Sequence, residues 1–169
     1  MDTVIPKEIA IYEPCVRLLF HPFMVSNSDY KLKREAMLPR PNGREVSLFR
    51  LNYTTIENCE AMGHSMNYGE NEFWGYAIVT VKDVEETNQT CDGAEAHIVY
   101  APMHKGEYVP TDIDLCVDDE NVDLPMHADM VYTEPLPREA CKARTAMRKY
   151  ASSLVKRMNR SLEKSTQSI

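Results

Sequence analysis

The chain has 169 residues, of which 43% are hydrophobic and 27% charged, a composition typical of one globular domain with a sizeable core. It contains no apolar run as long as the roughly 20 residues that span a membrane, and it begins without the basic and apolar regions of a signal peptide. Five scattered cysteines without a C-x-x-C pair are typical of reduced thiols. We therefore expect a cytoplasmic protein that does not enter membranes.

The first part of the chain predicts one strand and one short helical segment. Residues 16–20 are mainly apolar, and Pro22 ends the strand because the residue before a proline is pushed out of the helical region. Residues 31–38 could form one or two helical turns. Residues 39–43 predict a loop, since two prolines precede an Asn-Gly turn signal.

A strand followed by a capped helix is expected next. Residues 45–51 are largely apolar and predict the strand. Thr54 and Glu57 have the spacing of a capping box, in which two side chains satisfy the first free backbone N–H groups of a helix. We therefore expect a helix that begins there and ends at about Met66.

Residues 73–81 form the most apolar segment of the chain. The segment is apolar on both faces and rich in aromatic and β-branched residues, which is typical of a central strand. We expect both of its faces, including Trp74 and Ile78, to be buried. The polar residues 85–93 show no periodicity and predict a loop.

The remaining elements are two strands and a long helix. Strands are expected at residues 95–100 and 127–132, separated by a long surface excursion in which residues 113–117 could form a short strand. The helix is expected from Arg138 to about Lys164, after a start preset by the prolines of residues 135–137. Its apolar side chains recur at steps of three or four: Ala140, Ala143, Met147, Tyr150, Leu154, Met158 and Leu162.

These elements predict one α+β domain over residues 1–164. We expect a mixed sheet of about five strands, packed by a short central helix and the long C-terminal helix. Residues 165–169 predict a frayed tail, because nothing in the sequence would hold them.

Charge is unevenly distributed along the chain. Residues 70–136 hold 16 acidic and 2 basic side chains, whereas residues 137–169 hold nine basic and two acidic ones. The basic helix could lie against the acidic middle of its own chain, or either block could bind a charged partner. The acidic candidates are Asp112, Asp114, Asp118, Asp119, Glu120 and Asp123. The basic candidates are Arg138, Lys142, Arg144, Arg148, Lys149, Lys156, Arg157 and Arg160.

The acidic side chains suggest the more specific hypothesis, which is binding to a basic partner. Exposed ion pairs are typically worth under about 1 kcal/mol, so self-neutralisation is a weak reason for such segregation. An acidic surface can instead steer a basic partner and raise its rate of association. We therefore expect residues 112–123, together with the loop at 85–92, to contact a basic protein surface, while the basic helix stays with its own chain.

Motifs for catalysis or metal binding are weak. The five histidines have neither helical zinc spacing nor finger spacing with a cysteine, and Cys91 with His97 and His104 comes nearest. Asp112 and Asp114 lack the glycine and the final glutamate of an EF-hand loop. We expect no metal and no cofactor. A small hydrolase with a Cys–His or metal-assisted site remains an alternative, as does nucleic-acid binding by the basic helix.

Five short motifs, in chain order, resemble a known group of proteins. They are Arg17 to Pro22, Leu38-Pro39, Glu45-Val46-Ser47-Leu48, Gly75-Tyr76-Ala77 and His127-Ala128-Asp129. The succession resembles small bacterial proteins of unknown function that often lie beside toxin, protease or antiviral-defence genes. The resemblance implies an accessory or adaptor role beside a larger effector, and it implies no catalytic residue. The leading expectation is therefore a non-enzymatic protein-interaction module of a bacterial system.

Overall fold

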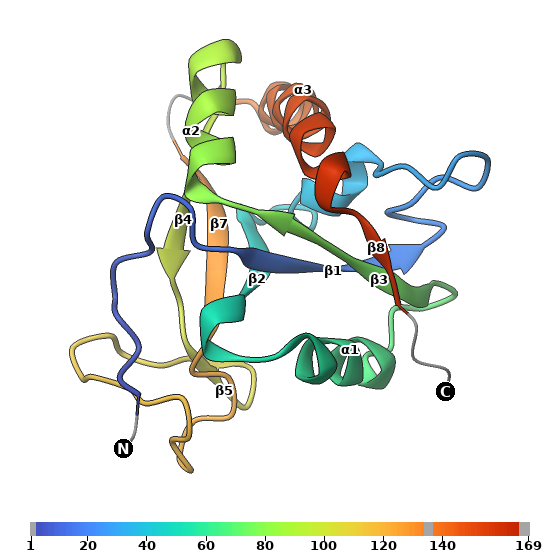
Figure 1. The fold of residues 1–169 in the computed structure, drawn as a ribbon. Helices are drawn as coiled ribbons and strands as arrows, with labels where there is room; N and C mark the ends of the chain where they lie inside the picture. The colour runs from blue at the N-terminus through green and yellow to red at the C-terminus, as the bar shows by residue number, and fades with distance from the viewer. Residues whose placement is uncertain (1–2, 134–136, 166–169) are drawn as a thin grey trace.

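The computed structural model describes residues 3–133 and 137–165 and is built on a six-stranded antiparallel sheet (Figure 1). The strand order is β4-β7-β2-β1-β3-β8, and a separate two-stranded hairpin is formed by β5 and β6. The strands are β1 (Cys15–His21), β2 (Glu45–Arg50), β3 (Glu72–Val79), β4 (Glu95–Tyr100), β5 (Met103–His104), β6 (Glu107–Tyr108), β7 (His127–Thr133) and β8 (Glu163–Lys164).

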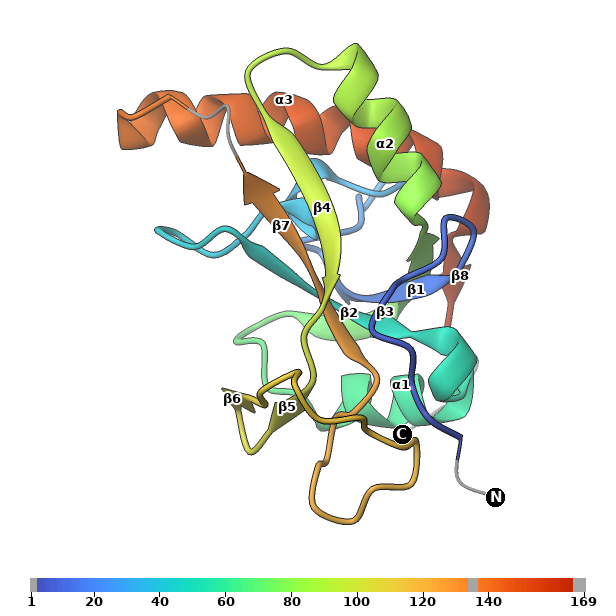
Figure 2. The same cartoon turned by 90° about the vertical axis from the view of Figure 1, so that its left-hand side faces the viewer.

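Helices cover the two faces of the sheet unequally. The α-helices are α1 (Ile56–Ser65), α2 (Val81–Thr90) and α3 (Ala140–Met158), and the 3-10 turns are η1 (Arg34–Met37), η2 (Leu51–Tyr53) and η3 (Asn159–Ser161). In Figures 1 and 2, α2 and α3 lie side by side on one face, whereas α1 and the β5–β6 hairpin lie on the other. The predicted α+β class is confirmed, although the sheet is antiparallel throughout and has six strands. In the described residues, no helix is long and apolar enough to cross a membrane.

Five predicted strands are confirmed, at β1, β2, β3, β4 and β7. They carry much of the core, because buried Leu19, Leu48, Ala128 and Met130 project from neighbouring strands. Tyr132 on β7 packs edge-on against Tyr150 of α3, with ring centroids 5.3 Å apart. The expected short strand at residues 113–117 is reduced to a bridge between Val4 and Cys116.

The expected loop at residues 85–93 is wrong, because α2 occupies most of it. Thr80 forms a capping box with Asp83: the Asp83 backbone N–H donates to the Thr80 hydroxyl, and the Thr80 N–H donates to the Asp83 carboxylate. The buried residues Asp83, Val84 and Thr87 follow the helical period. Thr80 lies within the apolar segment 73–81 that predicts a strand, and this pattern conceals the start of the helix. The α1 cap also differs by one residue, since Thr55 rather than Thr54 accepts from the Asn58 N–H.

The strand predicted at residues 73–81 is confirmed as β3, but its expected central position and full burial are wrong. β3 is second from the sheet edge, and β8 covers it only at Gly75 and Tyr76. Ala77 and Val79 are fully buried on one face, whereas Trp74 and Ile78 are half-buried. The face that carries Trp74 and Ile78 is also apolar, because it packs at the margin of the core.

The long C-terminal helix is confirmed in its apolar stripe but ends earlier than expected. Met147, Tyr150, Leu154 and Met158 are buried, and the chain then continues through η3 into β8. Ser165, the first residue of the expected frayed tail, donates its backbone N–H to the Trp74 carbonyl at 2.8 Å. The rest of that tail, 166–169, and the residues 134–136 before the helix lie outside the described residues.

A buried ion pair fastens the N-terminal segment to the end of β2. The Arg50 guanidinium donates to both carboxylate oxygens of Glu13, at 2.6 and 2.9 Å, and to the backbone carbonyls of Pro6 and Glu8. The Arg50 side chain is fully buried, and Glu13 is 6% exposed. A buried charge is tolerated only with such complete pairing, so this cluster defines the path of residues 6–13.

Candidate functional site

The acidic candidates lie together on the loop between β6 and β7, which we call the acidic segment (residues 112–123). All are exposed except Asp119, which is half-buried. Lys7 lies 3.8 Å from Asp114, and Asp123 accepts from the Lys105 backbone N–H at 3.2 Å. In Figures 1 and 2 this segment lies at the opposite end of the molecule from α3. The structure therefore does not bring the acidic and the basic candidates together.

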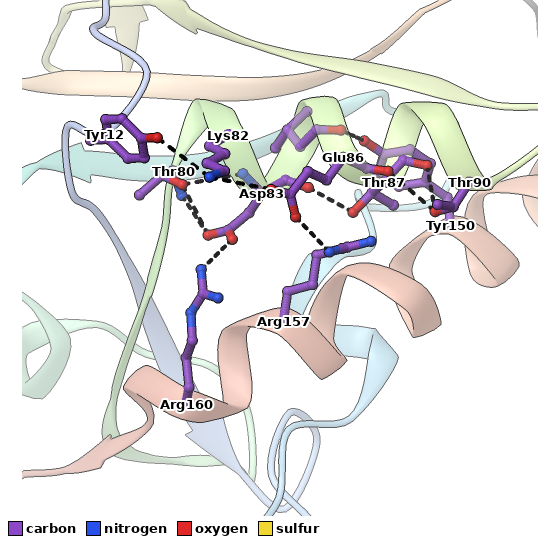
Figure 3. A network of polar contacts seen from close by, with 11 residues as sticks. Tyr12, Thr80, Lys82, Asp83, Glu86, Thr87, Thr90, Tyr150, Arg157 and Arg160 are labelled. Atoms are coloured by element: carbon purple, nitrogen blue, oxygen red, sulfur yellow. Dashed lines mark hydrogen bonds and ion pairs between the residues drawn. The ribbon is translucent and has the colours of Figure 1, made fainter.

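The basic candidates pair partly with another acidic stretch, on α2. Arg157 donates to Glu86 at 2.7 Å, and Arg160 donates to Asp83 at 2.5 Å (Figure 3). Arg144 donates to the backbone carbonyl of Pro39 at 2.7 Å. The other basic candidates on α3 are exposed. Two of the eight basic candidates thus pair within the chain, and Glu86 is the acidic residue of 85–92 that takes part in this internal contact.

A cleft of about 850 Å³ lies between α1, the β5–β6 hairpin and the middle of the sheet. α1 packs on β1 and β3, whereas the hairpin is held near β7 by the Met103 N–H, which donates to the Leu124 carbonyl at 3.1 Å. The strands β1 and β2 are paired at Cys15↔Arg50 and Val16↔Phe49 and then diverge. This divergence opens the floor of the cleft. Its apolar walls include Leu18, Phe20, Val46, Phe49, Met62 and Met103.

Polar side chains from β2 and β7 meet on this floor. Ser47 is opposite Asp129 and Phe49 is opposite His127 in the antiparallel register, and opposite residues project from the same face. Ser47 Oγ and His127 Nε2 are 2.9 Å apart, and His127 Nδ1 lies 2.7 Å from the carbonyl oxygen of Ala101. Both ring nitrogens of this buried histidine therefore have a partner.

Asp129 and Tyr108 complete the polar cluster. An Asp129 carboxylate oxygen lies 3.8 Å from His127 Nε2, and the Tyr108 hydroxyl donates to the other carboxylate oxygen. Burial lowers the pKa of His127, against the opposing influence of the Ala101 carbonyl and of Asp129. Burial raises the pKa of Asp129, although the hydrogen bond from Tyr108 and the nearby His127 counteract part of that shift.

Arg17 brings positive charge to the gap between β1 and β2. Its Nη1 donates to the Ser47 carbonyl at 3.3 Å, and its Nε donates to the Ala36 carbonyl at 2.7 Å. Burial lowers its pKa to about 10, which leaves the guanidinium protonated at neutral pH. Arg17, Ser47 and His127 come from three different strands, β1, β2 and β7, and the structure places them in contact.

The Cys–His and metal alternatives gain no support. Cys59 is fully buried, and burial raises its thiol pKa to about 11, which suppresses the reactive thiolate. Over residues 3–133 and 137–165, no three His, Cys, Asp or Glu side chains are grouped so as to hold a metal ion. His104 lies 3.8 Å from Asp123, and His97 lies 3.8 Å from Glu95. In the described part of the chain, Cys91, His97 and His104 are not grouped as metal ligands.

Sequence reasoning missed the cluster around Ser47 and His127 because these residues are 80 positions apart. The available signal was the alternation within two predicted strands: Ser47 stands between apolar neighbours, and His127 and Asp129 flank Ala128. Comparisons with other proteins do not extend the assignment. No family model, curated protein or solved structure matches this chain.

Proposed function

We propose that the protein is an interaction module that binds an extended segment of a partner protein. The cleft receives an apolar side chain of that segment, and the acidic segment contacts basic residues beside it. The observation that carries this proposal is the position of Asp123, which belongs to the acidic segment and also lines the cleft. A single bound chain can therefore contact both surfaces.

The lining of the cleft suits an apolar anchor. Concave, mostly apolar surfaces with a few convergent polar groups are the usual form of binding sites. Four methionines line this cleft, and methionine adapts readily to the shapes of different bound groups. Met66 is 46% exposed, so part of this apolar lining faces solvent. The lining methionines are Met24, Met62, Met66 and Met103.

The charge of the adjoining surface indicates the chemistry of the partner. Five of the six acidic side chains in the acidic segment are exposed. Their field attracts a basic chain and raises its rate of association, with an effect that falls as salt rises. The resemblance to proteins encoded beside toxin, protease and antiviral-defence genes supports an accessory role, with a larger protein of such a system as the partner.

Binding can be tested with labelled peptides that carry one apolar anchor between lysines and arginines. Fluorescence anisotropy would compare the wild type with the triple reversal Asp118→Lys, Asp119→Lys, Glu120→Lys. We expect the reversal to weaken binding at least about tenfold at low salt. Met66→Asp, which places a charge in the cleft, should weaken binding at every salt concentration.

A matched control carries the same change in charge elsewhere. Glu57, Glu70 and Glu72 are exposed and lie outside the cleft and the acidic segment. Their triple reversal to lysine should leave peptide affinity within about twofold. The proposal is wrong if the acidic segment reversal and Met66→Asp both bind the basic peptides as tightly as the wild type does.

A further inference from the structure

The contact between Ser47 and His127 has the geometry of a nucleophile and its general base. We propose that Ser47 attacks the carbonyl carbon of a carboxylic ester bound in the cleft, with His127 as the base, and that the protein thereby hydrolyses the ester. This activity goes beyond the binding role proposed above. It rests on the side chains of two strands, and it does not depend on the acidic segment.

The hydrogen bonds define the tautomer of His127. A backbone carbonyl can only accept, so the proton of the neutral ring resides on Nδ1, which donates to the Ala101 oxygen at 2.7 Å. Nε2 then carries the free lone pair, and it accepts from the Ser47 hydroxyl at 2.9 Å. A histidine held in this tautomer by a fixed acceptor is ready to take the serine proton.

The exposure of the two residues differs in the way that such chemistry requires. His127 is 2% exposed, and its desolvation favours the neutral, basic form of the ring. Ser47 is exposed at the floor of the cleft. A bound ester can therefore reach the hydroxyl oxygen while the imidazole stays shielded from bulk water.

Charges around the pair match those that develop during the reaction. His127 becomes an imidazolium when it takes the proton, and the Asp129 carboxylate, 3.8 Å from Nε2, stabilises that cation. Tyr108 orients Asp129 through its hydroxyl.

Water is the only co-reactant that this hydrolysis needs. Ser47 Oγ forms a bond to the carbonyl carbon while its proton moves to His127 Nε2. The tetrahedral intermediate collapses, the ester C–O bond breaks, and His127 returns the proton to the departing alcohol. Water then attacks the acyl-serine and gives a proton to His127, which passes it to Ser47 as the carboxylic acid leaves.

A different explanation of the same contact is that the Ser47 hydroxyl only provides the hydrogen bond that Nε2 of the buried His127 ring needs. The two explanations differ in reactivity, so the test uses an alkyl fluorophosphonate probe, which phosphonylates activated serines. We expect intact-mass analysis of the wild type to show one adduct and peptide mapping to place it on Ser47. Ser47→Ala should abolish the adduct, whereas Ser28→Ala, which changes an exposed serine outside the cleft, should label at the wild-type rate.

A pH profile and a conservative variant separate a base from a structural partner. The labelling rate should fall in acid with a midpoint below the ordinary imidazole value of 6.5, because the ring must be neutral to accept the proton. Asp129→Asn should slow labelling about 10- to 100-fold while circular dichroism shows a folded protein. Absence of an adduct on Ser47 of the folded wild type after hours with excess probe would overturn the proposal. Peptide binding by Ser47→Ala should persist, so failure of one proposal leaves the other standing.

Discussion

Replacing Arg50 with methionine should lower the free energy of unfolding by about 3–5 kcal/mol, the usual cost of removing one partner from a buried ion pair. The guanidinium donates two hydrogen bonds to Glu13 and two to the backbone carbonyls of Pro6 and Glu8. Methionine fills much of the same volume but donates none of these bonds. The Glu13 carboxylate, 6% exposed, would stay buried without its cation.

Urea titration can measure this loss, with the fluorescence of Trp74 as the probe, because the chain has one tryptophan and it is half-buried. At about 2–4 °C per kcal/mol for a domain of this size, the melting temperature should also fall by roughly 6–20 °C. The double variant Arg50→Met, Glu13→Leu removes the stranded carboxylate and should recover at least half of the lost stability. A loss below about 1 kcal/mol for the single variant would refute the reasoning, and so would a double variant no more stable than the single one.

Three further outcomes follow from burial and close contacts. Leu48→Ala should cost about 2–5 kcal/mol and Ile78→Ala clearly less in urea titration, since Leu48 is fully buried and Ile78 is half-buried. Gly75→Ala should displace β8, because a Cβ there would lie 2.1 Å from the carbonyl oxygen of the facing β8 strand, and amide exchange of residues 163–165 should become faster. With a disulfide thiol reagent at pH 8, exposed Cys141 should react quickly and Cys59 slowly, because burial raises the pKa of Cys59 to about 11 and leaves little thiolate.

The α+β class and five of the strands could be predicted from the sequence because they depend on local hydrophobic periodicity. The helix α2 could not, because Thr80 extends the apolar strand pattern and at the same time caps the next helix. Periodicity was also a poor guide to the position of β3 in the sheet. Apolar residues on both faces indicate burial, whereas the neighbours of a strand are decided by distant pairing, here with β1 and the two-residue β8.

The candidate site depends on distant pairing even more strongly. Ser47 and His127 meet because β2 pairs with β7 in one register, and a shift of one residue would turn Ser47 to the opposite face. The Ala101 carbonyl that orients His127 comes from beyond the end of β4. Neither contact leaves a spacing signal in a single sequence. The charge pattern did not identify the internal partner of the basic residues, which is α2: Arg157 pairs with Glu86 and Arg160 with Asp83.

The strand order has a consequence for how the chain acquires its structure. Every neighbouring pair in the six-stranded sheet joins strands that at least one other element separates along the chain. Proteins dominated by such non-local pairing fold in roughly milliseconds to seconds, because loop-closure entropy is lost before the contacts form. During synthesis, β2 therefore emerges long before its neighbour β7. Until β7 arrives, one edge of β2 lacks the strand that covers it in the folded protein, and unpaired strand edges of this kind promote aggregation.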